Sequence, residues 1–181
     1  MAPKVRGGFG VMVDADCGTS WLSEGKAMTT PFWEDCQVSQ QHRLRESTVL
    51  FGMDLPRRKQ FLRFQHMVTQ AAETSLTCGS CALGVATVVA GRAEAMVQPQ
   101  QWPWDWVSAY MIQVAGGKVI WFHYRNGQLV RLEEPDPASY SRLNRHDQGG
   151  LAFIGGNPAV VDELWSSLNK TWLPLNWLWP E

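Results

Sequence analysis

The stretch that decides the fold runs from residue 79 to residue 97 and reads GSCALGVATVVAGRAEAMV. Ser80 has a side-chain oxygen that can cap a helix, and residues 81–90 are apolar almost throughout. Gly91 follows as a helix-ending residue, and residues 95–97 then predict a short strand. A helix with so little polar surface is buried on several sides. The stretch therefore predicts a buried helix that leads into a core strand.

Strands and helices alternate on both sides of this stretch. Residues 47–52 predict a short buried strand, and residues 57–74 predict an amphipathic helix because their apolar side chains fall on one face. Downstream, Pro103 opens a helix that extends to about Ala115. This alternation predicts an α/β fold in which helices cover a sheet.

The C-terminal third of the chain continues the pattern. Asn126-Gly127 is a strong hairpin signal between two strands, residues 118–124 and 128–131. Residues 151–154 predict another buried strand, and Asn157-Pro158 then starts a helix that ends near residue 168. We therefore expect the alternation of strands and helices to extend from residue 47 to residue 168.

The N-terminal part is different in character. Residues 8–13 and 18–22 predict two short strands, whereas residues 30–46 are polar and aperiodic and predict a loop. A hairpin followed by a loop lacks the helices of the later segments. The sequence thus predicts a small all-strand part ahead of the α/β part.

The composition limits the class of protein. The chain has 181 residues, of which 45% are hydrophobic and 18% charged, with a net charge of −1. Such a chain can form a sizeable core, and it has no basic excess that would attract nucleic acid. No apolar run approaches the roughly 18 residues of a membrane span, and the N-terminal apolar run is too short for a signal peptide. We expect a cytoplasmic globular protein that binds neither nucleic acid nor membrane.

Cys78-Gly-Ser-Cys81 has the C-x-x-C form of a redox pair or half a zinc site. Zinc would need two more ligands, and the sequence has no second C-x-x-C and no H-x3-5-H motif. A dithiol pair needs no further ligand, but two cysteines at this spacing also occur without any redox role. Both interpretations stay open from the residues alone.

Other polar residues form no complete catalytic constellation. Asp14 and Asp16 lie in a glycine-bounded turn, where aspartates usually serve the turn itself. The four histidines show no metal-ligand spacing: His42, His66, His123 and His146. The sequence contains no phosphate-binding P-loop, no G-x-S-x-G and no G-x-G-x-x-G. From these motifs we predict no catalytic residue.

The chain has ten tryptophans, and they gather in two places. Three lie within residues 102–106, and three lie within residues 172–179 beside prolines. Indole rings bury a large apolar area, so core packing is the simple interpretation. The terminal group either folds back over the domain or forms a contact surface.

Several motifs together resemble the inositol monophosphatase family, the magnesium-dependent phosphatases of small phosphate monoesters. Residues 79–83 (GSCAL) are similar to the family pattern G-S/T-A-A-L, and residues 91–96 (GRAEAM) to G-R-A-D-A-Y. Residues 103–105 (PWD) and 114–117 (VAGG) are similar to P-W-D and E-A-G-G. The resemblance extends from the hairpin at residues 8–27 to the GGNP segment and the helix after it. It implies the C-terminal mixed-sheet α/β layer of that fold, preceded by an incomplete antiparallel part.

The resemblance also implies roles for single residues. Asp105 matches the aspartate that ligates a catalytic Mg²⁺ in the family. Gly79, Ser80 and Cys81 match the helix N-terminus that contacts substrate, and Gln98 stands where the family has a substrate-binding glutamate. A carboxylate in the first turn of a helix is well placed to point out of its N-terminal end. Cys81 replaces a small residue of the alanine type, which disfavours a redox role.

The departures from the family concern the metal site. The family builds its magnesium cluster mainly from a G-x-x-x-E-[DE] motif and a D-P-[IL]-D-G-T motif, and this sequence contains neither. One aspartate cannot place two cations. We therefore expect the C-terminal half of the family pattern, with catalysis by this chain alone doubtful.

The resemblance divides the chain into three expected parts: a remnant of the N-terminal antiparallel sheet, 1–46; an α/β domain, 47–170; and a Trp- and Pro-rich tail, 171–181. Two functional hypotheses remain. The first is a phosphate monoesterase acting on inositol, histidinol or related sugar phosphates, completed by residues from elsewhere. The second is a non-catalytic binding module that pairs with a partner, or with a second copy, through an exposed sheet edge near residue 8.

Overall fold

A computed structural model describes residues 8–14, 19–25, 33–52, 59–99, 103–125, 128–133 and 151–171. In chain order its elements are β1 (Gly8–Asp14), β2 (Thr19–Gly25), β3 (Trp33–Asp35), a 3₁₀ turn η1 (Leu44–Glu46), β4 (Thr48–Gly52), α1 (Lys59–Ala71), β5 (Thr74–Cys78), α2 (Cys81–Val89), β6 (Ala95–Gln98), α3 (Pro103–Val114), β7 (Lys118–Arg125), β8 (Gln128–Leu132), β9 (Leu151–Gly156) and α5 (Pro158–Thr171).

The larger sheet has six strands in the order β5-β4-β6-β9-β7-β8. β4 pairs in parallel with β5 and β6, whereas β9 runs antiparallel to both β6 and β7. β7 and β8 form the expected antiparallel hairpin. The mixed sheet confirms the α/β fold class that the alternation of strands and helices predicts.

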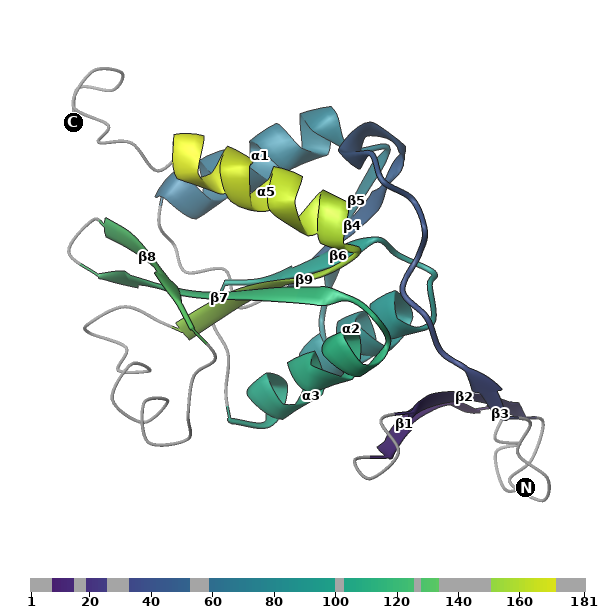
Figure 1. Ribbon diagram of the computed structural model, residues 1–181. Coiled ribbons are helices and arrows are strands. Elements are labelled where there is room, and N and C mark those ends of the chain that lie inside the picture. Colours follow the sequence, from purple (N-terminus) through teal and green to yellow (C-terminus); the bar gives the residue numbers. More distant parts are fainter. Residues whose placement is uncertain are drawn as a thin grey trace, which may run out of the picture.

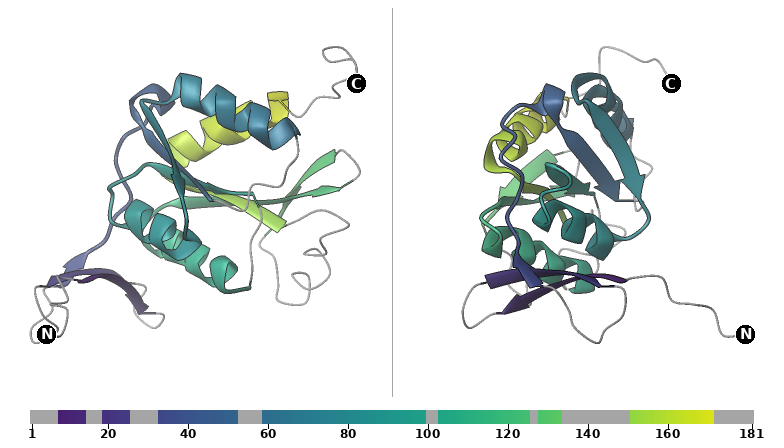
Figure 2. Two further views of the ribbon diagram at one scale, coloured as in Figure 1. Left: turned by 180° about the vertical axis from the view of Figure 1, so that it is seen from behind. Right: turned by 90° about the vertical axis from the view of Figure 1, so that its right-hand side faces the viewer.

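Helices cover both faces of this sheet, as Figure 1 shows. α1 and α5 pack side by side on one face, and α2 and α3 pack together on the other. β1, β2 and β3 form a separate antiparallel sheet that contacts the α2–α3 layer, which is visible in both views of Figure 2. This small sheet is the antiparallel N-terminal part that the sequence predicts.

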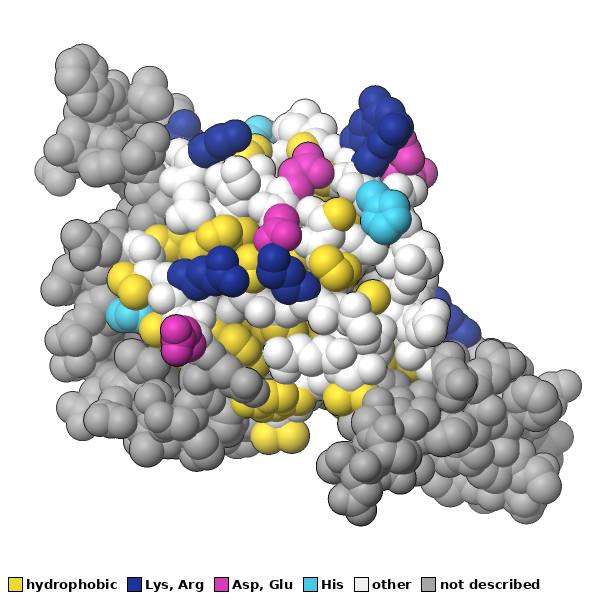
Figure 3. Space-filling view, viewed as in Figure 1, with side chains coloured by type: hydrophobic (Ala, Val, Ile, Leu, Met, Phe, Trp, Pro, Cys, Tyr) yellow, Lys and Arg dark blue, Asp and Glu magenta, His cyan; other side chains and the backbone are white. Residues whose placement is uncertain are grey.

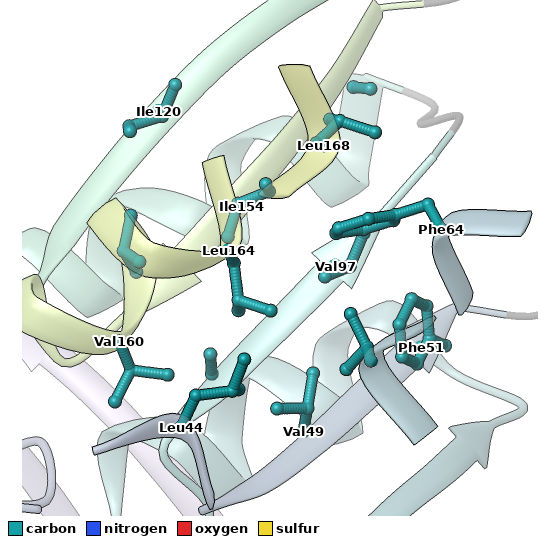
Figure 4. Packing of buried hydrophobic residues seen from close by; sticks show 14 of the residues in the cluster. Leu44, Val49, Phe51, Phe64, Val97, Ile120, Ile154, Val160, Leu164 and Leu168 are labelled. Carbon is teal, nitrogen blue, oxygen red and sulfur yellow. The ribbon is translucent and has the colours of Figure 1, made fainter. Parts of the chain in front are cut away.

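Two groups of buried side chains fill the space between the helices and the six-stranded sheet. Beneath α1 and α5, Phe51, Phe64 and Leu164 lie among aliphatic residues of the central strands (Figure 4). Beneath α2 and α3, Phe153 and Ile112 pack in the second group. The central strands β6 and β9 are buried over their whole length because both of their faces are covered.

The ends of two helices follow the sequence signals. Ser80 caps α2, since its Oγ accepts a hydrogen bond from Leu83 N at 3.3 Å. Gly91 lies beyond the end of α2 with a φ of 68°, the left-handed conformation that favours glycine. Asn157 caps α5 in the same way through its Oδ1, which accepts from Ala159 N at 2.9 Å.

The structure corrects two sequence-based expectations. The predicted loop 30–46 contains β3 and the η1 turn. The predicted helix over residues 57–74 ends at Ala71, and residues 74–78 form strand β5, which the sequence analysis missed. β5 lies at one edge of the described six-stranded sheet and reads TSLTC, so it has neither the apolar run of a central strand nor strong β-branched enrichment.

Several expectations concern residues outside the described part of the chain: Asp16, the turn at residues 126–127 and the tryptophans after residue 171. In the described part, no helix has the length and apolar character needed to cross a lipid bilayer. Figure 3 shows Lys and Arg side chains on one face scattered among acidic, uncharged and hydrophobic ones.

Candidate functional site

The candidate site lies at the carboxyl ends of the three parallel strands. The strand register places Gly52 opposite Cys78, and it places Phe51 opposite Val97, the residue before Gln98. α2 begins three residues after β5 ends, and α3 begins after β6, so both helices start at this edge of the sheet. In open α/β sheets, ligands bind outside the carboxyl ends of the strands. The topology thus brings the predicted residues to one edge.

Three of the predicted substrate-binding residues lie where α2 begins: Gly79, the N-cap Ser80 and the first helical residue, Cys81. Gly79 and Ser80 are exposed, whereas Cys81 is buried. The N-terminal end of a helix presents backbone N–H groups and a partial positive charge, both of which favour hydroxyl or phosphate oxygens. The exposed Gly79-Ser80 loop leaves this end accessible on its outer side.

Asp105 lies in the first turn of α3 and is only 7% exposed. The Ser108 Oγ donates to the Asp105 backbone carbonyl oxygen at 2.7 Å, and it lies 3.9 Å from the Cys81 Sγ. Cys81 and Asp105 also interact directly. Burial is the largest cause that raises the pKa of the Cys81 thiol well above its usual range, and the charge of Asp105 and its hydrogen bond to the thiol raise that pKa further. The thiol is therefore protonated at neutral pH, where it can donate a hydrogen bond.

This raised pKa predicts a pH dependence of stability. The thiol has an ordinary pKa of 9.0 in the unfolded chain, so above about pH 9 it loses its proton only when the chain unfolds. Stabilisation from this group is present below that pH and declines above it. Above about pH 9, we expect the free energy of unfolding of the wild type to fall by about 1.4 kcal/mol per pH unit relative to that of Cys81→Ala. Urea denaturation at several pH values measures the free energy of unfolding of both proteins. An equal dependence on pH in both would contradict the raised pKa of Cys81.

Gln98 lies at the end of β6 and is buried. A Cβ placed on Gly52 would collide with the Gln98 side-chain carboxamide, so this side chain lies across the end of β4. Gly52 is therefore required for the observed position of Gln98. The structure places Gln98 at the same sheet edge as Cys78, and its role in binding substrate stays a prediction.

The sequence analysis missed three residues of the site: Gly52, Cys78 as a neighbour of α2, and Ser108. Ser108 stands three residues after Asp105, a spacing at which helical neighbours meet, and this was the available signal. Gly52 carried no local signal, because its importance comes from a side chain on another strand. The structure brings Asp105 and Cys81 into contact across α2 and α3, and the roles that the resemblance implies for them stay predictions.

The described residues do not fit a magnesium site. Among them, no group of three or more His, Cys, Asp or Glu side chains could hold a metal ion. Mg²⁺ needs near-octahedral oxygen ligation, whereas the Asp105 carboxylate interacts with the protonated Cys81 thiol, which is not an oxygen ligand. The same finding leaves Cys78 and Cys81 without the further ligands that zinc requires within the described ranges.

Comparison with known proteins identifies the fold. No protein-family model and no curated protein matches the sequence. Solved structures that do match include the suhB extragenic suppressor protein from Bartonella henselae, with a TM-score of 0.58 and 23% identity over 90% of this chain and 57% of that one. Mycobacterium tuberculosis SuhB matches with a TM-score of 0.60 and 18% identity, over 84% of this chain and 50% of that one.

A third match is the inositol monophosphatase from Anabaena, with a TM-score of 0.57 and 22% identity over 90% of this chain and 58% of that one. The chain thus spans only 50–58% of the length of these structures. The likeness shows that the chain has the inositol monophosphatase-like α/β fold over about half of that fold. This extent is consistent with the C-terminal half that the motifs indicate.

Proposed function

We propose that this chain provides the substrate-binding half of a small-molecule phosphate monoesterase site, with a phosphorylated polyol as ligand. The observation that supports this most is the meeting of Cys81 and Asp105 at the carboxyl edge of the parallel strands. It joins a helix N-terminus, which favours oxygen anions, to a buried carboxylate, which accepts hydrogen bonds from hydroxyl groups. A polyol phosphate carries both kinds of group.

Each side of the site has a distinct binding task. The backbone N–H groups in the first turn of α2 would donate to hydroxyl or phosphate oxygens. The Asp105 carboxylate would accept hydrogen bonds from ligand hydroxyls, and the neutral Gln98 amide can both donate and accept. Magnesium, which the family resemblance implies, would need carboxylates from outside the described residues, so binding rather than hydrolysis is the activity proposed for this chain alone. A cytoplasmic location belongs to the same proposal.

A binding titration with a matched control tests this proposal. We expect inositol monophosphate to bind the wild type, and Asp105→Asn to weaken binding on the order of tenfold, because a charged acceptor is lost. The control is Asp162→Asn on α5, an exposed carboxylate that pairs with Lys118 at 2.6 Å and lies away from the site. Isothermal titration calorimetry with and without Mg²⁺, together with circular dichroism, gives affinity and folding. Equal affinities for the two variants would contradict the role of Asp105.

Phosphate release separates binding from catalysis. A panel of phosphate monoesters, assayed with Mg²⁺ and with EDTA, should give no turnover by this chain alone. Magnesium-dependent turnover that Asp105→Asn abolishes would show a complete metal site that includes residues outside the described ranges.

A second candidate function is an interaction module. β5 is one of the two edge strands of the described six-stranded sheet, it contains no charged residue, and Leu76 is 52% exposed. Edges without charge or proline are available for pairing with another strand. No binding of any phosphate ester, together with a molecular mass that rises with protein concentration, would favour this function over the first.

A further inference from the structure

The segment Cys78-Gly-Ser-Cys81 connects the edge strand β5 to the first turn of α2. Cys78 is the last residue of β5 and is half-buried, and Cys81 is the first residue of α2 and is buried. Both residues are thiols in this structure. The two cysteines therefore differ in access: a reagent in solution reaches Cys78 more readily than Cys81.

The Cys78 sulfur lies against the first turn of α2. Its Sγ donates to the Ser80 carbonyl oxygen at 3.2 Å, and that carbonyl also accepts from Gly84 N at 3.0 Å within the helix. A Cβ placed on Gly84 would lie 3.7 Å from the Cys78 Sγ. The sulfur thus contacts the turn of helix that Cys81 begins, on the side where glycine leaves room.

The burial pattern of α2 shows that Cys81 faces the same inner side. Gly84 is buried with Cys81, whereas the intervening Ala82 and Leu83 are exposed. Residues three apart on a helix lie on neighbouring positions of one face, so the Cys81 side chain is on the Gly84 side. Only two residues separate the cysteines, and both side chains lie at the first turn of α2, so the short Gly79-Ser80 connection keeps the two sulfurs in the same part of the structure.

We propose that Cys78 and Cys81 form a reversible disulfide, in which Cys78 is the attacking thiol and Cys81 the resolving thiol. The oxidant is a low-molecular-weight disulfide. The Cys78 thiolate attacks one of its sulfurs, and the other half leaves as a thiolate that takes up the proton released by Cys78. The Cys81 thiol then gives up its proton as its sulfur attacks the Cys78 sulfur, and the second half of the oxidant leaves as a thiolate that takes up this proton. Two protein thiols are oxidised, and one disulfide is reduced to two thiols.

The order of attack follows from burial. A mixed disulfide needs space for the incoming half of the oxidant, and of the two cysteines in this segment the half-buried Cys78 offers it. No part of the oxidant has to fit beside Cys81, because the Cys81 sulfur attacks the Cys78 sulfur. Cys36 is buried as well and lies outside the C-x-x-C segment, so its alkylation serves as an internal control. Disulfide formation does not depend on whether the chain binds a phosphate ester.

The test uses the full chain equilibrated with glutathione and glutathione disulfide at varied ratios. After acid quenching, unfolding, alkylation and digestion, mass spectrometry reports the state of each cysteine separately. We expect the wild-type peptide that contains both cysteines to lose both alkylation sites with no glutathione adduct, while Cys36 is alkylated in full. Addition of dithiothreitol should restore both sites.

Two single variants test the roles of Cys78 as the attacking thiol and Cys81 as the resolving thiol. In Cys81→Ser the resolving thiol is absent, so the glutathione adduct on Cys78 should exceed that of the wild type by about tenfold or more. In Cys78→Ser we expect no adduct on Cys81, because that sulfur is buried. Wild-type protein that accumulates the adduct on Cys78, a disulfide to another cysteine or between chains, or an adduct on Cys81 in Cys78→Ser would each overturn the proposal. Circular dichroism of each protein confirms that the folded chain is measured.

Discussion

Gly156→Ala is expected to lower the free energy of unfolding by more than about 3 kcal/mol, or to prevent folding. Gly156 ends β9 with a φ of 150°, a conformation essentially limited to glycine. A Cβ at this position would lie 2.6 Å from the Ala95 Cα and would also meet the Glu94 carbonyl oxygen. Both are backbone atoms of the neighbouring strand region, so no side-chain rotation relieves the contact.

Gly116→Ala is the matched control. Gly116 also has a positive φ, 79°, but a Cβ there would meet nothing within 4 Å. It should therefore cost only the backbone strain of a left-handed residue, about 1 kcal/mol. Urea denaturation followed by circular dichroism measures both variants. Similar losses for the two variants would show that backbone strain, rather than the collision with β6, governs the effect.

The close approach at Gly156 explains why part of the fold was predictable and part was not. Helix α2 was predicted with its cap at Ser80, because capping and apolar patterning are local properties. The strand order, with β9 inserted between β6 and β7, depends on contacts between distant segments and carries no local signal. β5 was missed for a related reason: an edge strand does not need the apolar pattern of a central one.

In the candidate site, too, some features could be predicted from the local sequence and others depend on contacts between distant segments. Asp105 and residues 79–81 were identified from motifs, and the structure brings Cys81 and Asp105 together across two helices. The part that Gly52 plays could not be predicted, because it is fixed by Gln98 on a neighbouring strand. The raised pKa of the Cys81 thiol also depends on burial, which the fold as a whole determines. The motifs thus pointed to candidate residues, whereas the fold determines their contacts and the protonation of the Cys81 thiol.

Phe153→Ala should lower the free energy of unfolding by about 3–5 kcal/mol, the usual range for a buried phenylalanine. Phe153 lies on the central strand β9, is fully buried, and packs edge-on against the Trp121 ring with centroids 5.5 Å apart. Leu76→Ala on the edge strand is the control, and since Leu76 is 52% exposed it should cost less than about 1 kcal/mol. Urea denaturation compares them, and equal losses would contradict the assigned burial.

The position of Phe153 gives this variant a second, local effect that separates the two layers. Phe153 belongs to the buried group beneath α2 and α3, whereas Phe51 belongs to the group beneath α1 and α5. A cavity beneath α2 and α3 removes packing from the helices that position Cys81 and Asp105. We expect Phe153→Ala and Phe51→Ala to lose similar stability, while only Phe153→Ala makes Cys81 react faster with an alkylating reagent under native conditions. Equal acceleration in both variants would mean that Cys81 is exposed by global unfolding, and the layer beneath the site would then have no separate part in protecting it.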